Sequence, residues 1–556
     1  MGKLFGTDGI RGHAVSSTIS DHTSIDKLVD ERQLSLGLMQ LIGEALGNRL
    51  RPSSDRIAEV VVGWDERPLN ARLVSSLTVG LHLSGCKVTW TGECATPGLH
   101  ACILDSEADA GCMITASHNP VSDSGVKIFN NEARKTLPEE EKELEVLIHQ
   151  FAAEERELSD SEIRELGRPD SQVNGLNIHR SVLNNRLPLL KSRYLGDGDP
   201  SALIPEEGLL LDSSKGSASV WLADWMTENL FPTLELSFTC QALNDGCGAG
   251  DISPTLRMTW QELTCKHHNH VIFDGLSSRY REGVWKPGMI LAAALDGDGD
   301  RCLCIRVDDY GGGIEVIDGD RMLDVLTMAA SHNQSGLKGK VAASIESDLA
   351  LLSSLDRLDA DLIALESAVG DRWLAVALGP EKDSQSGLLR GIDEPFHLGG
   401  EDSGHLLMTT PHPNKPEHWA LVGDGIATLI ATLFASACQH RITPFSKGWK
   451  LRKSISPSDR SRWDGKNQHA KAVESMLWEW LPHGAWQRMI IPGEENLLLM
   501  KAKIGAGELT VAVRNSGTQA KTSVSIRATE EALSVIETPL GLMESLIAEL
   551  SQRLRP

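Results

Sequence analysis

The chain has 556 residues, which is too many for a single hydrophobic core, so we expect roughly three to four domains. Hydrophobic residues make up 41% of the chain and charged residues 24%, a composition typical of folded globular proteins that excludes an extensively disordered chain. The formal net charge of −23 argues against a nucleic-acid partner, because binding to a phosphate backbone requires a basic surface.

Short apolar runs rich in β-branched residues alternate with longer helical patterns. Residues 58–62 and 87–91 are predicted strands on either side of a predicted helix at residues 69–84. Further strands are predicted at residues 209–212, 290–295, 341–344 and 509–513. Because strands that alternate with helices form parallel sheets covered by helices on both faces, the expected fold class is α/β.

Polar segments interrupt this alternation. Residues 137–168 are dense in Glu and Arg and are predicted to form a solvated helix with i,i+4 ion pairs. Residues 169–185 are predicted to be a domain linker. Residues 379–391 and 411–418 are predicted to be surface insertions.

The ten cysteines are scattered and include no Cys-x-x-Cys pair. In a chain of this length they indicate reduced, mostly buried thiols in a cytosolic protein. The first twelve residues are polar and glycine-rich, and no apolar stretch approaches membrane-spanning length. We therefore expect a cytoplasmic protein with no membrane partner, as a monomer or a homodimer.

Residues 115–120 read Thr-Ala-Ser-His-Asn-Pro and follow an apolar run, so we expect a loop at the end of a strand, where ligands bind on open α/β sheets. We call this segment the serine loop. Ser117, beside His118 and upstream of Lys127, is suited to act as a nucleophile or to carry a phosphate. An ordinary turn is the alternative, because Ser, Asn and Pro favour turns for conformational reasons alone.

Residues 296–301, the aspartate loop, place Asp296, Asp298 and Asp300 at alternate positions between glycines. Oxygen-only ligands of this kind suit Mg²⁺. A calcium EF-hand is excluded, because its sixth and twelfth positions require Gly and Glu and here hold Arg301 and Val307. A plain turn stays open, but three adjacent carboxylates repel one another without a cation, which favours a metal site.

Two further loops offer groups that bind sugars and phosphates. Residues 399–405, the sugar loop, contain Glu401, Ser403 and His405, which suit hydrogen bonds to sugar hydroxyls and proton transfer. Residues 514–521, the phosphate loop, follow a predicted strand and contain Arg514, Ser516, Gly517, Thr518 and Lys521, a composition that favours phosphate binding. A surface loop and a β-turn are the respective alternatives.

Together and in this order, these loops resemble those of the α-D-phosphohexomutase superfamily, and in detail those of the bacterial phosphoglucosamine mutases. The resemblance covers nearly the whole chain. It includes segments 5–12, 63–67, 247–251, 318–320, 369–372 and 423–425 in addition to the four loops.

The resemblance implies four domains around a cleft: three related α/β domains with mixed or parallel sheets and a smaller α+β domain at the C-terminus. The expected divisions are residues 1–188 with the serine loop, 189–311 with the aspartate loop, 312–446 with the sugar loop and 447–556 with the phosphate loop.

The resemblance also implies roles for individual residues. Ser117 is expected to be the phosphoserine and to complete the Mg²⁺ shell formed by the three aspartates. Arg11, His118, Lys127, Arg301 and His405 are expected to stabilise charge and transfer protons. Glu401 and Ser403 are expected to bind sugar hydroxyls, and the distal phosphate is expected to bind Arg514, Ser516, Gly517, Thr518 and Lys521.

The implied reaction interconverts glucosamine 6-phosphate and glucosamine 1-phosphate through a hexose 1,6-bisphosphate, which also serves as activator. A phosphomannomutase/phosphoglucomutase is the alternative within the superfamily, and a magnesium phosphatase or a non-catalytic sugar-phosphate-binding protein are the alternatives outside it. The sequence departs from the usual pattern at Ser124, Gly250, Gln519 and Ala520, where Asn, Thr, Glu and Pro are usual.

Overall fold

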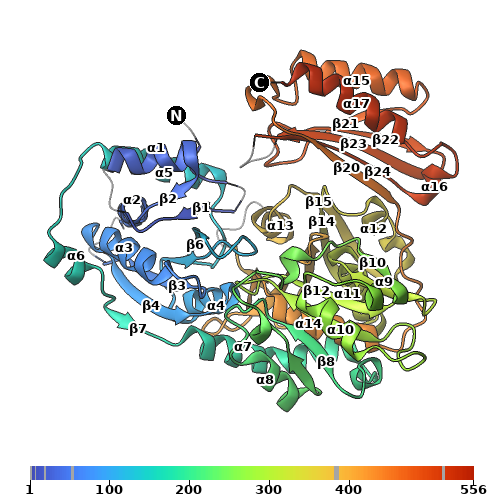
Figure 1. Ribbon diagram of the computed structural model, residues 1–556, viewed down its shortest axis with the longest axis horizontal. Helices are drawn as coiled ribbons and strands as arrows, with labels where there is room; N and C mark the ends of the chain where they lie inside the picture. The colour runs from blue at the N-terminus through green and yellow to red at the C-terminus, as the bar shows by residue number, and fades with distance from the viewer. Residues whose placement is uncertain are drawn as a thin grey trace. The chain divides into compact units, whose positions relative to one another are not determined.

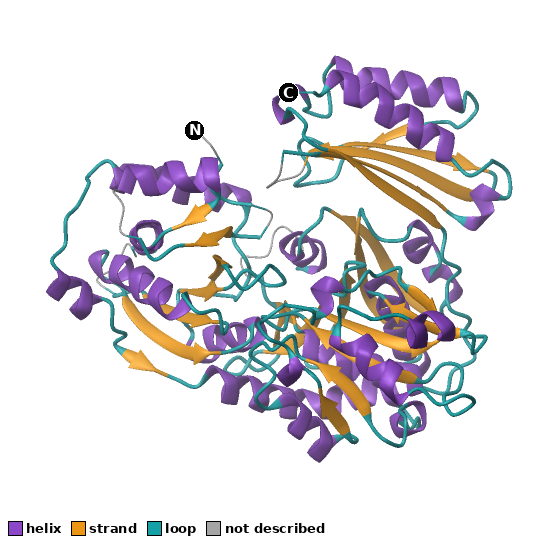
Figure 2. Ribbon diagram, in the orientation of Figure 1, coloured by secondary structure: helices purple, strands orange, loops and turns teal. Residues whose placement is uncertain are grey.

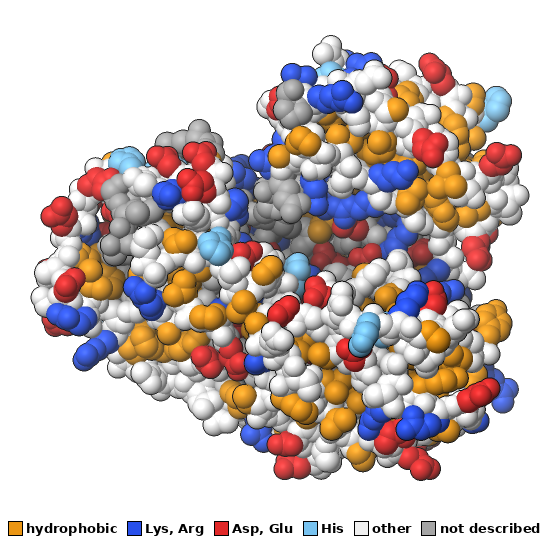
Figure 3. All heavy atoms as spheres, viewed as in Figure 1, with side chains coloured by type: hydrophobic (Ala, Val, Ile, Leu, Met, Phe, Trp, Pro, Cys, Tyr) orange, Lys and Arg blue, Asp and Glu red, His pale blue; other side chains and the backbone are white. Residues whose placement is uncertain are grey.

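The computed structural model describes residues 3–6, 8–17, 21–51, 56–380, 387–515 and 520–555. The chain divides into two compact units, unit 1 (Met1–Ser335 and Gly379–His440) and unit 2 (Gly336–Leu378 and Arg441–Pro556). No helix in the described part of the chain is long and apolar enough to cross a membrane. Acidic, basic and hydrophobic side chains all reach the surface of the molecule (Figure 3).

A seven-stranded mixed sheet in the order β2-β1-β6-β5-β3-β4-β7 forms the N-terminal part of unit 1 (Figure 1). Its strands are β1 (Ile10–Ala14), β2 (Gln33–Leu34), β3 (Glu59–Trp64), β4 (Lys87–Glu93), β5 (Ala110–Ile114), β6 (Asp123–Asn130) and β7 (Ser171–Gln172). Strands β3, β4 and β5 are parallel, and β6 runs antiparallel to β1 and β5. The strands predicted at 58–62 and 87–91 are confirmed as β3 and β4.

Helices cover both faces of this sheet, as an α/β fold requires. They are α1 (Asp21–Glu31), α2 (Leu36–Arg49), α3 (Asn70–Leu83), α4 (Thr96–Ser106), α5 (Pro138–Ala152), α6 (Asp160–Leu166) and α7 (Gly175–Leu190). Because side chains alternate along a strand, Val60 and Val62 join the core that contains residues of α2 and α3. Val61 joins the core that contains residues of α4.

Two predictions in this region are wrong. Residues 137–168 form two helices, α5 and α6, because Ser159 begins a new helix with a capping box that includes Glu162. The linker predicted at 169–185 contains β7 and most of α7, which Asn174 caps. Its polar composition concealed a helix that buries only a few side chains, among them His179 and Leu183.

A second, six-stranded sheet in unit 1 has the order β10-β13-β12-β11-β8-β9. Its strands are β8 (Leu209–Asp212), β9 (Thr233–Glu235), β10 (Arg257–Thr259), β11 (Ile290–Leu295), β12 (Cys302–Val307) and β13 (Gly313–Ile317), with helices α8 (Leu222–Asn229), α9 (Trp260–Cys265) and α10 (Val271–Arg279). Strands β8 and β11 have the predicted bounds. Strand β13 pairs with β12, so the expected division after residue 311 falls inside this sheet.

The rest of unit 1 contains β16 (Leu389–Arg390), β17 (Phe396–Gly400), β18 (Leu406–Pro411) and β19 (His418–Gly423), which pair antiparallel in the order β17-β18-β19-β16. Helices α11 (Gly319–Asn333) and α14 (Gly425–Ala437) pack against each other. The insertion predicted at 411–418 is the β18–β19 turn and is limited to residues 412–417. Part of the insertion predicted at 379–391 lies outside the described residues.

Unit 2 contains the parallel pair β14 (Leu337–Ser344) and β15 (Ala360–Ser367), with α12 (Leu349–Ser353) and α13 (Asp371–Leu378). It also contains an antiparallel sheet of β20 (Trp449–Ile455), β24 (Thr522–Ala528), β23 (Gly507–Asn515), β22 (Leu498–Ile504) and β21 (Gln487–Met489), in that order. Helices α15 (Gln468–Trp480) and α17 (Leu540–Arg553) cover one face of this sheet, and α16 (Glu530–Leu533) follows β24 (Figure 2). The strands predicted at 341–344 and 509–513 are confirmed within β14 and β23.

Candidate active site

The aspartate loop is the turn between the antiparallel strands β11 and β12. One carboxylate oxygen from each of Asp296, Asp298 and Asp300 lies within 4.8 Å of the other two, and all three residues are buried. Asp296 Oδ1 accepts the backbone N–H groups of Asp300 and Arg301, each at 3.1 Å, which folds the turn back on its first residue. Gly299 supplies the positive φ of +69° that this turn requires.

Ser117 lies at the end of β5 and points toward this turn. Its Oγ donates to Asp296 Oδ2 at 2.7 Å, although 179 residues separate the two in sequence. Ser117 is fully buried and has a φ of 54°, in the left-handed region that a residue with a side chain rarely adopts. Such a conformation costs about 1–3 kcal/mol and persists only where its surroundings enforce it.

The surroundings that hold Ser117 are two clamps on backbone carbonyls. Arg67 and Asn244 each donate to Ser117 O at 2.8 Å and also to Asn119 O. Asp65 supports the first clamp, since it accepts from Arg67 Nε at 3.1 Å and from Thr115 Oγ1 at 2.6 Å. The strained backbone of the serine loop is therefore fixed from both of the first two sheets.

Lys127 projects from β6 into the carboxylates. Its Nζ lies 2.6 Å from Asp298 Oδ2 and 2.7 Å from Asp300 Oδ2, and it is also 3.6 Å from Asp8. Burial by itself would lower the pKa of Lys127, but these three carboxylates outweigh it and hold that pKa well above its usual range. Arg11 contacts the same group, with 2.8 Å to Asp8 and 3.2 Å to Ala116 O.

The aspartate loop fits a hard divalent cation. Burial, reinforced by repulsion from Asp300 and Asp298, raises the pKa of Asp296 to about 7. In the same loop, Lys127 and His405 outweigh burial and hold the pKa of Asp300 well below its usual range. Asp298 Oδ1 is buried and has no hydrogen-bond partner. An unpartnered carboxylate oxygen beside two further carboxylates is a donor set suited to Mg²⁺.

The remaining predicted residues of unit 1 surround these carboxylates. His405 Nδ1 lies 3.4 Å from Asp300 Oδ1, and Arg301 Nε lies 3.9 Å from Asp296 Oδ2. Burial, together with repulsion from Arg301 and Arg11, lowers the pKa of His118 to about 3, so this imidazole is neutral at pH 7.

The sugar loop joins β17 to β18 and is fixed against the end of the aspartate loop. Gly404 O accepts from Cys302 N at 3.0 Å, and a Cβ on Gly404, whose φ is +87°, would meet Cys302 O. The loop holds Glu401 buried and Ser403 half-buried. Glu401 is close enough to Arg301 to help raise the pKa of that guanidinium, after the larger contributions of Asp296 and Asp300.

In unit 2, Arg514 ends β23 in a setting that its predicted role did not anticipate. Its guanidinium pairs with Glu346 at 2.7 Å and with Glu494 at 2.9 Å. Burial opposes the charge, but these two carboxylates raise the pKa of Arg514 above its usual value. Lys521 is half-buried. Ser516, Gly517 and Thr518 lie outside the described residues, so their predicted contacts are not described.

Several residues of the site were not predicted from the sequence. Asp8, Asp65, Arg67, Thr96 and Asn244 all contact the serine loop, the aspartate loop or Lys127. Thr96 Oγ1 donates to Asp298 Oδ2 at 2.5 Å. The segments 5–12 and 63–67 belong to the family resemblance and pointed to Asp8, Asp65 and Arg67, whereas no motif pointed to Thr96 or Asn244.

The structure shows the surroundings of two residues that depart from the family pattern, Ser124 and Gly250. Ser124 is buried and donates to Asn70 Oδ1 at 2.6 Å. A Cβ at Gly250 would lie 2.5 Å from His118 Cβ, so a larger residue at this position would displace the histidine beside Ser117.

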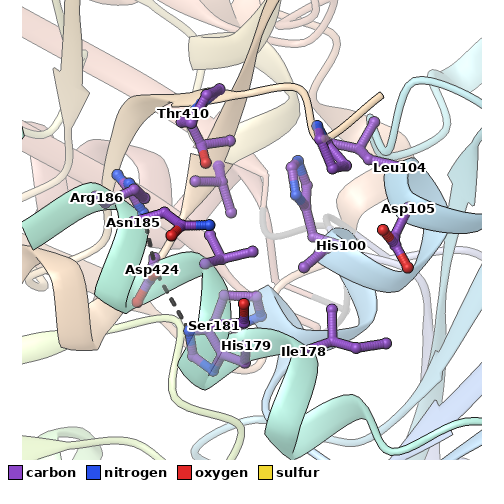
Figure 4. A pocket seen from close by; sticks show the side chains of 16 residues that line it. His100, Leu104, Asp105, Ile178, His179, Ser181, Asn185, Arg186, Thr410 and Asp424 are labelled. Carbon is purple, nitrogen blue, oxygen red and sulfur yellow. Dashed lines mark hydrogen bonds and ion pairs between the residues drawn. The ribbon is translucent and has the colours of Figure 1, made fainter. Parts of the chain in front are cut away.

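A cavity of about 290 Å³ lies elsewhere in unit 1 (Figure 4). Residues of α4 and α7 line it, together with Thr410 and Pro411 of β18, Pro413 of the β18–β19 turn and Val422 of β19. Asp424, at its edge, pairs with Arg186 at 3.1 Å and with His179 at 3.3 Å. All three side chains are buried, and Asp424 also caps α14, so this group ties α7 to the start of α14.

Comparison with known proteins gives matches along the chain. Residues 2–155 match the family description phosphoglucomutase/phosphomannomutase, alpha/beta/alpha domain I, and residues 318–448 match domain III. A phosphoglucosamine mutase of Lactobacillus delbrueckii subsp. bulgaricus is 26% identical over 524 residues, covering 92% of this chain and 96% of the relative. One from Ligilactobacillus salivarius is 28% identical over 435 residues, or 78% of each chain.

Solved structures share the fold. The crystal structure of a phosphoglucomutase/phosphomannomutase family protein from Burkholderia thailandensis superimposes with a TM-score of 0.61 at 18% identity. The superposition covers 99% of this chain and 98% of that one. The expected α/β class and its arrangement of sheets are therefore confirmed.

Proposed function

Because the chain belongs to the phosphoglucomutase/phosphomannomutase family, we propose that it is a mutase that interconverts glucosamine 6-phosphate and glucosamine 1-phosphate. The single observation that carries the proposal is the 2.7 Å contact between Ser117 Oγ and Asp296 beside two further buried carboxylates. Two relatives that match 92% and 78% of this chain are phosphoglucosamine mutases, which supports the amino sugar as substrate.

Ser117 is proposed to carry the phosphoryl group between substrate molecules. The phosphoserine donates its phosphoryl group to a free sugar hydroxyl, the Ser117 O–P bond breaks, and the hydroxyl proton is transferred so that Ser117 is released as the alcohol. The bisphosphate then turns over, and its other phosphoryl group returns to Ser117. The left-handed backbone and the clamps from Arg67 and Asn244 fix Ser117 Oγ in one position for both transfers.

Asp296, Asp298 and Asp300 are proposed to hold Mg²⁺ with a phosphate oxygen on Ser117. When bound there, the ion neutralises charge on the phosphoryl oxygens. Lys127 and Arg301 add positive charge at the same place, and Lys127 stays protonated because its pKa is held high. His118 is neutral and is proposed, with His405 and Arg11, to assist proton transfer.

Glu401 and Ser403 are proposed to bind sugar hydroxyls, and Arg514 and Lys521, with Ser516, Gly517 and Thr518, to bind the distal phosphate. A four-domain division remains our proposal, with the second domain extended to Ile317 so that its sheet stays whole. We further propose that the protein is cytoplasmic and that hexose 1,6-bisphosphate activates it.

The test is turnover on a panel of glucosamine, glucose and mannose phosphates with a catalytic amount of hexose 1,6-bisphosphate. We expect the highest kcat/KM on glucosamine phosphates and a mass increase of one phosphoryl group on the intact chain. Ser117→Ala should abolish both. Ser122→Ala, at an exposed position between the serine loop and β6, is the matched control and should keep both. Preference for glucose or mannose phosphates would point to the alternative mutase. Binding without turnover would point to a sensor, and turnover by Ser117→Ala would exclude the serine.

A further inference from the structure

Unit 1 holds a second cluster of metal-ligating side chains in its six-stranded sheet. Asp212 ends β8, and Cys240 and Cys247 stand at the two ends of a loop that follows β9. One ligand atom from each of the three residues lies within 4.8 Å of the other two. All three side chains are buried, with 5% or less of each residue exposed. We call these residues the thiol cluster.

The carboxylate of the thiol cluster is already oriented. Asp212 Oδ1 accepts the backbone N–H of Ser214 at 2.8 Å, and Oδ2 accepts that of Gly248 at 2.6 Å. His270 Nε2 hydrogen-bonds to Gly248 O at 3.1 Å, which holds the peptide next to Cys247. Carboxylates that bind metals are commonly fixed by outer hydrogen bonds of this kind.

Without an ion, the cluster is an unfavourable group to bury. Asp212 is fully buried, and His270 Nε2 lies 3.8 Å from its Oδ2. A core of two thiols packed beside a carboxylate gains little from apolar burial, because the carboxylate must be desolvated to form it.

We propose that Asp212, Cys240 and Cys247 bind a zinc ion. Two thiolates and one carboxylate are the donors that Zn²⁺ prefers, whereas Mg²⁺ prefers oxygen alone. This site therefore differs in chemistry from the aspartate loop, which offers only oxygen. Among the residues that the structure describes, three would bind the ion, which leaves its fourth tetrahedral position to water. Binding releases the two thiol protons, so the two positive charges of the ion balance the two thiolates and the site keeps the single negative charge of Asp212.

The zinc has a consequence for the serine loop, because the loop that it closes contains Asn244. Asn244 Nδ2 donates to Ser117 O at 2.8 Å and to Asn119 O at 2.9 Å, and Ser214 donates to Asn244 Oδ1. Lys215 adds bonds to the carbonyls of Cys240 and Gln241. An ion that joins Cys240 to Cys247 would fix both ends of this loop, and with it one of the two clamps on Ser117.

The first experiment measures the metal directly and does not depend on the proposed activity. The full chain, purified without chelator, is analysed for zinc by mass spectrometry, and we expect about one zinc per chain. Replacement of zinc by cobalt should produce a thiolate-to-cobalt charge-transfer band in the near ultraviolet and tetrahedral d–d bands in the visible. Cys240→Ser and Cys247→Ser should lose the zinc and the thiolate band. Cys265→Ser is the matched control, because Cys265 is exposed in the same sheet region, and it should keep both.

Measurements on the wild-type protein alone can refute the proposal, so the test does not depend on whether the variants fold. Zinc far below one per chain, with no thiolate band after addition of cobalt, would refute the site. A band retained in the Cys240→Ser, Cys247→Ser double variant would place the metal elsewhere, and a disulfide between the two cysteines in the purified protein would refute it too. A final readout is the mutase rate after chelation and return of Mg²⁺ alone. After this treatment we expect a rate about tenfold lower than that of the zinc-bound protein, because the Asn244 clamp on Ser117 is loosened. Addition of zinc should restore the rate.

Discussion

The affinity of the aspartate loop for Mg²⁺ should depend steeply on pH, because a proton and the metal ion compete for Asp296. Burial and the neighbouring carboxylates raise the pKa of Asp296 from 3.8 to about 7. At pH 6 a group with this pKa is ionised in about one molecule in eleven, so Mg²⁺ should bind about tenfold more weakly than at pH 8, a difference of about 1.4 kcal/mol. The proton displaced at pH 6 should be close to one per ion bound.

The raised pKa of Asp296 also makes the stability of the metal-free protein depend on pH. Because Asp296 binds its proton more tightly in the folded than in the unfolded protein, the metal-free fold should lose stability as pH rises from about 4 to about 7. Mg²⁺ should reverse this loss, and its stabilising effect should be larger at pH 8 than at pH 6.

Isothermal titration calorimetry in two buffers with different ionisation enthalpies measures both the affinity and the number of protons released. Asp296→Asn is the control, because it keeps the shape of the side chain but removes the titrating group. The variant should bind Mg²⁺ more weakly than wild type at pH 8 and show a flatter pH profile. An equal Kd at pH 6 and pH 8 in the wild type, or an unchanged slope in the variant, would refute the reasoning.

Three further predictions concern single substitutions in the two units. Glu346→Gln should lower KM about twofold to fivefold in steady-state assays, because a carboxylate 2.7 Å from Arg514 would compete with the phosphate that we propose binds there. An unchanged KM would contradict this. Gly250→Thr should lower kcat about tenfold with little change in Tm, since the added Cβ would lie 2.5 Å from His118 Cβ; a wild-type rate would show that His118 is free to move. Asp424→Asn should cost about 3–5 kcal/mol in urea unfolding, because it leaves a buried guanidinium without its counter-charge; a loss below about 1 kcal/mol would count against that pairing.

Local order was predictable from the sequence wherever one physical signal dominated. Short apolar runs defined the strands that became β3, β8, β11 and β14, since a strand inside a sheet covered on both faces buries every side chain of such a run. Alternating aspartates and glycines defined the aspartate loop, because three carboxylates in six residues are costly without a cation. The serine loop was identified from its position directly after an apolar strand.

The two predictions for residues 137–185 were wrong because no single sequence pattern dominates there. The Glu-rich stretch continued a helical pattern past Ala152, but the first helix ends there and the capping box at Ser159 begins another. The segment that contains α7 was predicted to be a linker because its sequence is mostly polar. The helix is polar because it buries only a few side chains, including Leu183 and Arg186. A buried arginine carries no apolar signal, and its partner Asp424 is 238 residues away in sequence.

The sequence by itself determined the kinds of chemical groups, and the tertiary structure decided which of them meet. Ser117 and Asp296 were each predicted from local pattern, and their contact follows from two separate sheets that bring the ends of β5 and β11 together. The clamp from Asn244 and the thiol cluster could not be predicted, because a lone amide or cysteine has no sequence signature. Such contacts depend on how separate elements pack, and packing is a property of the folded chain rather than of any local segment.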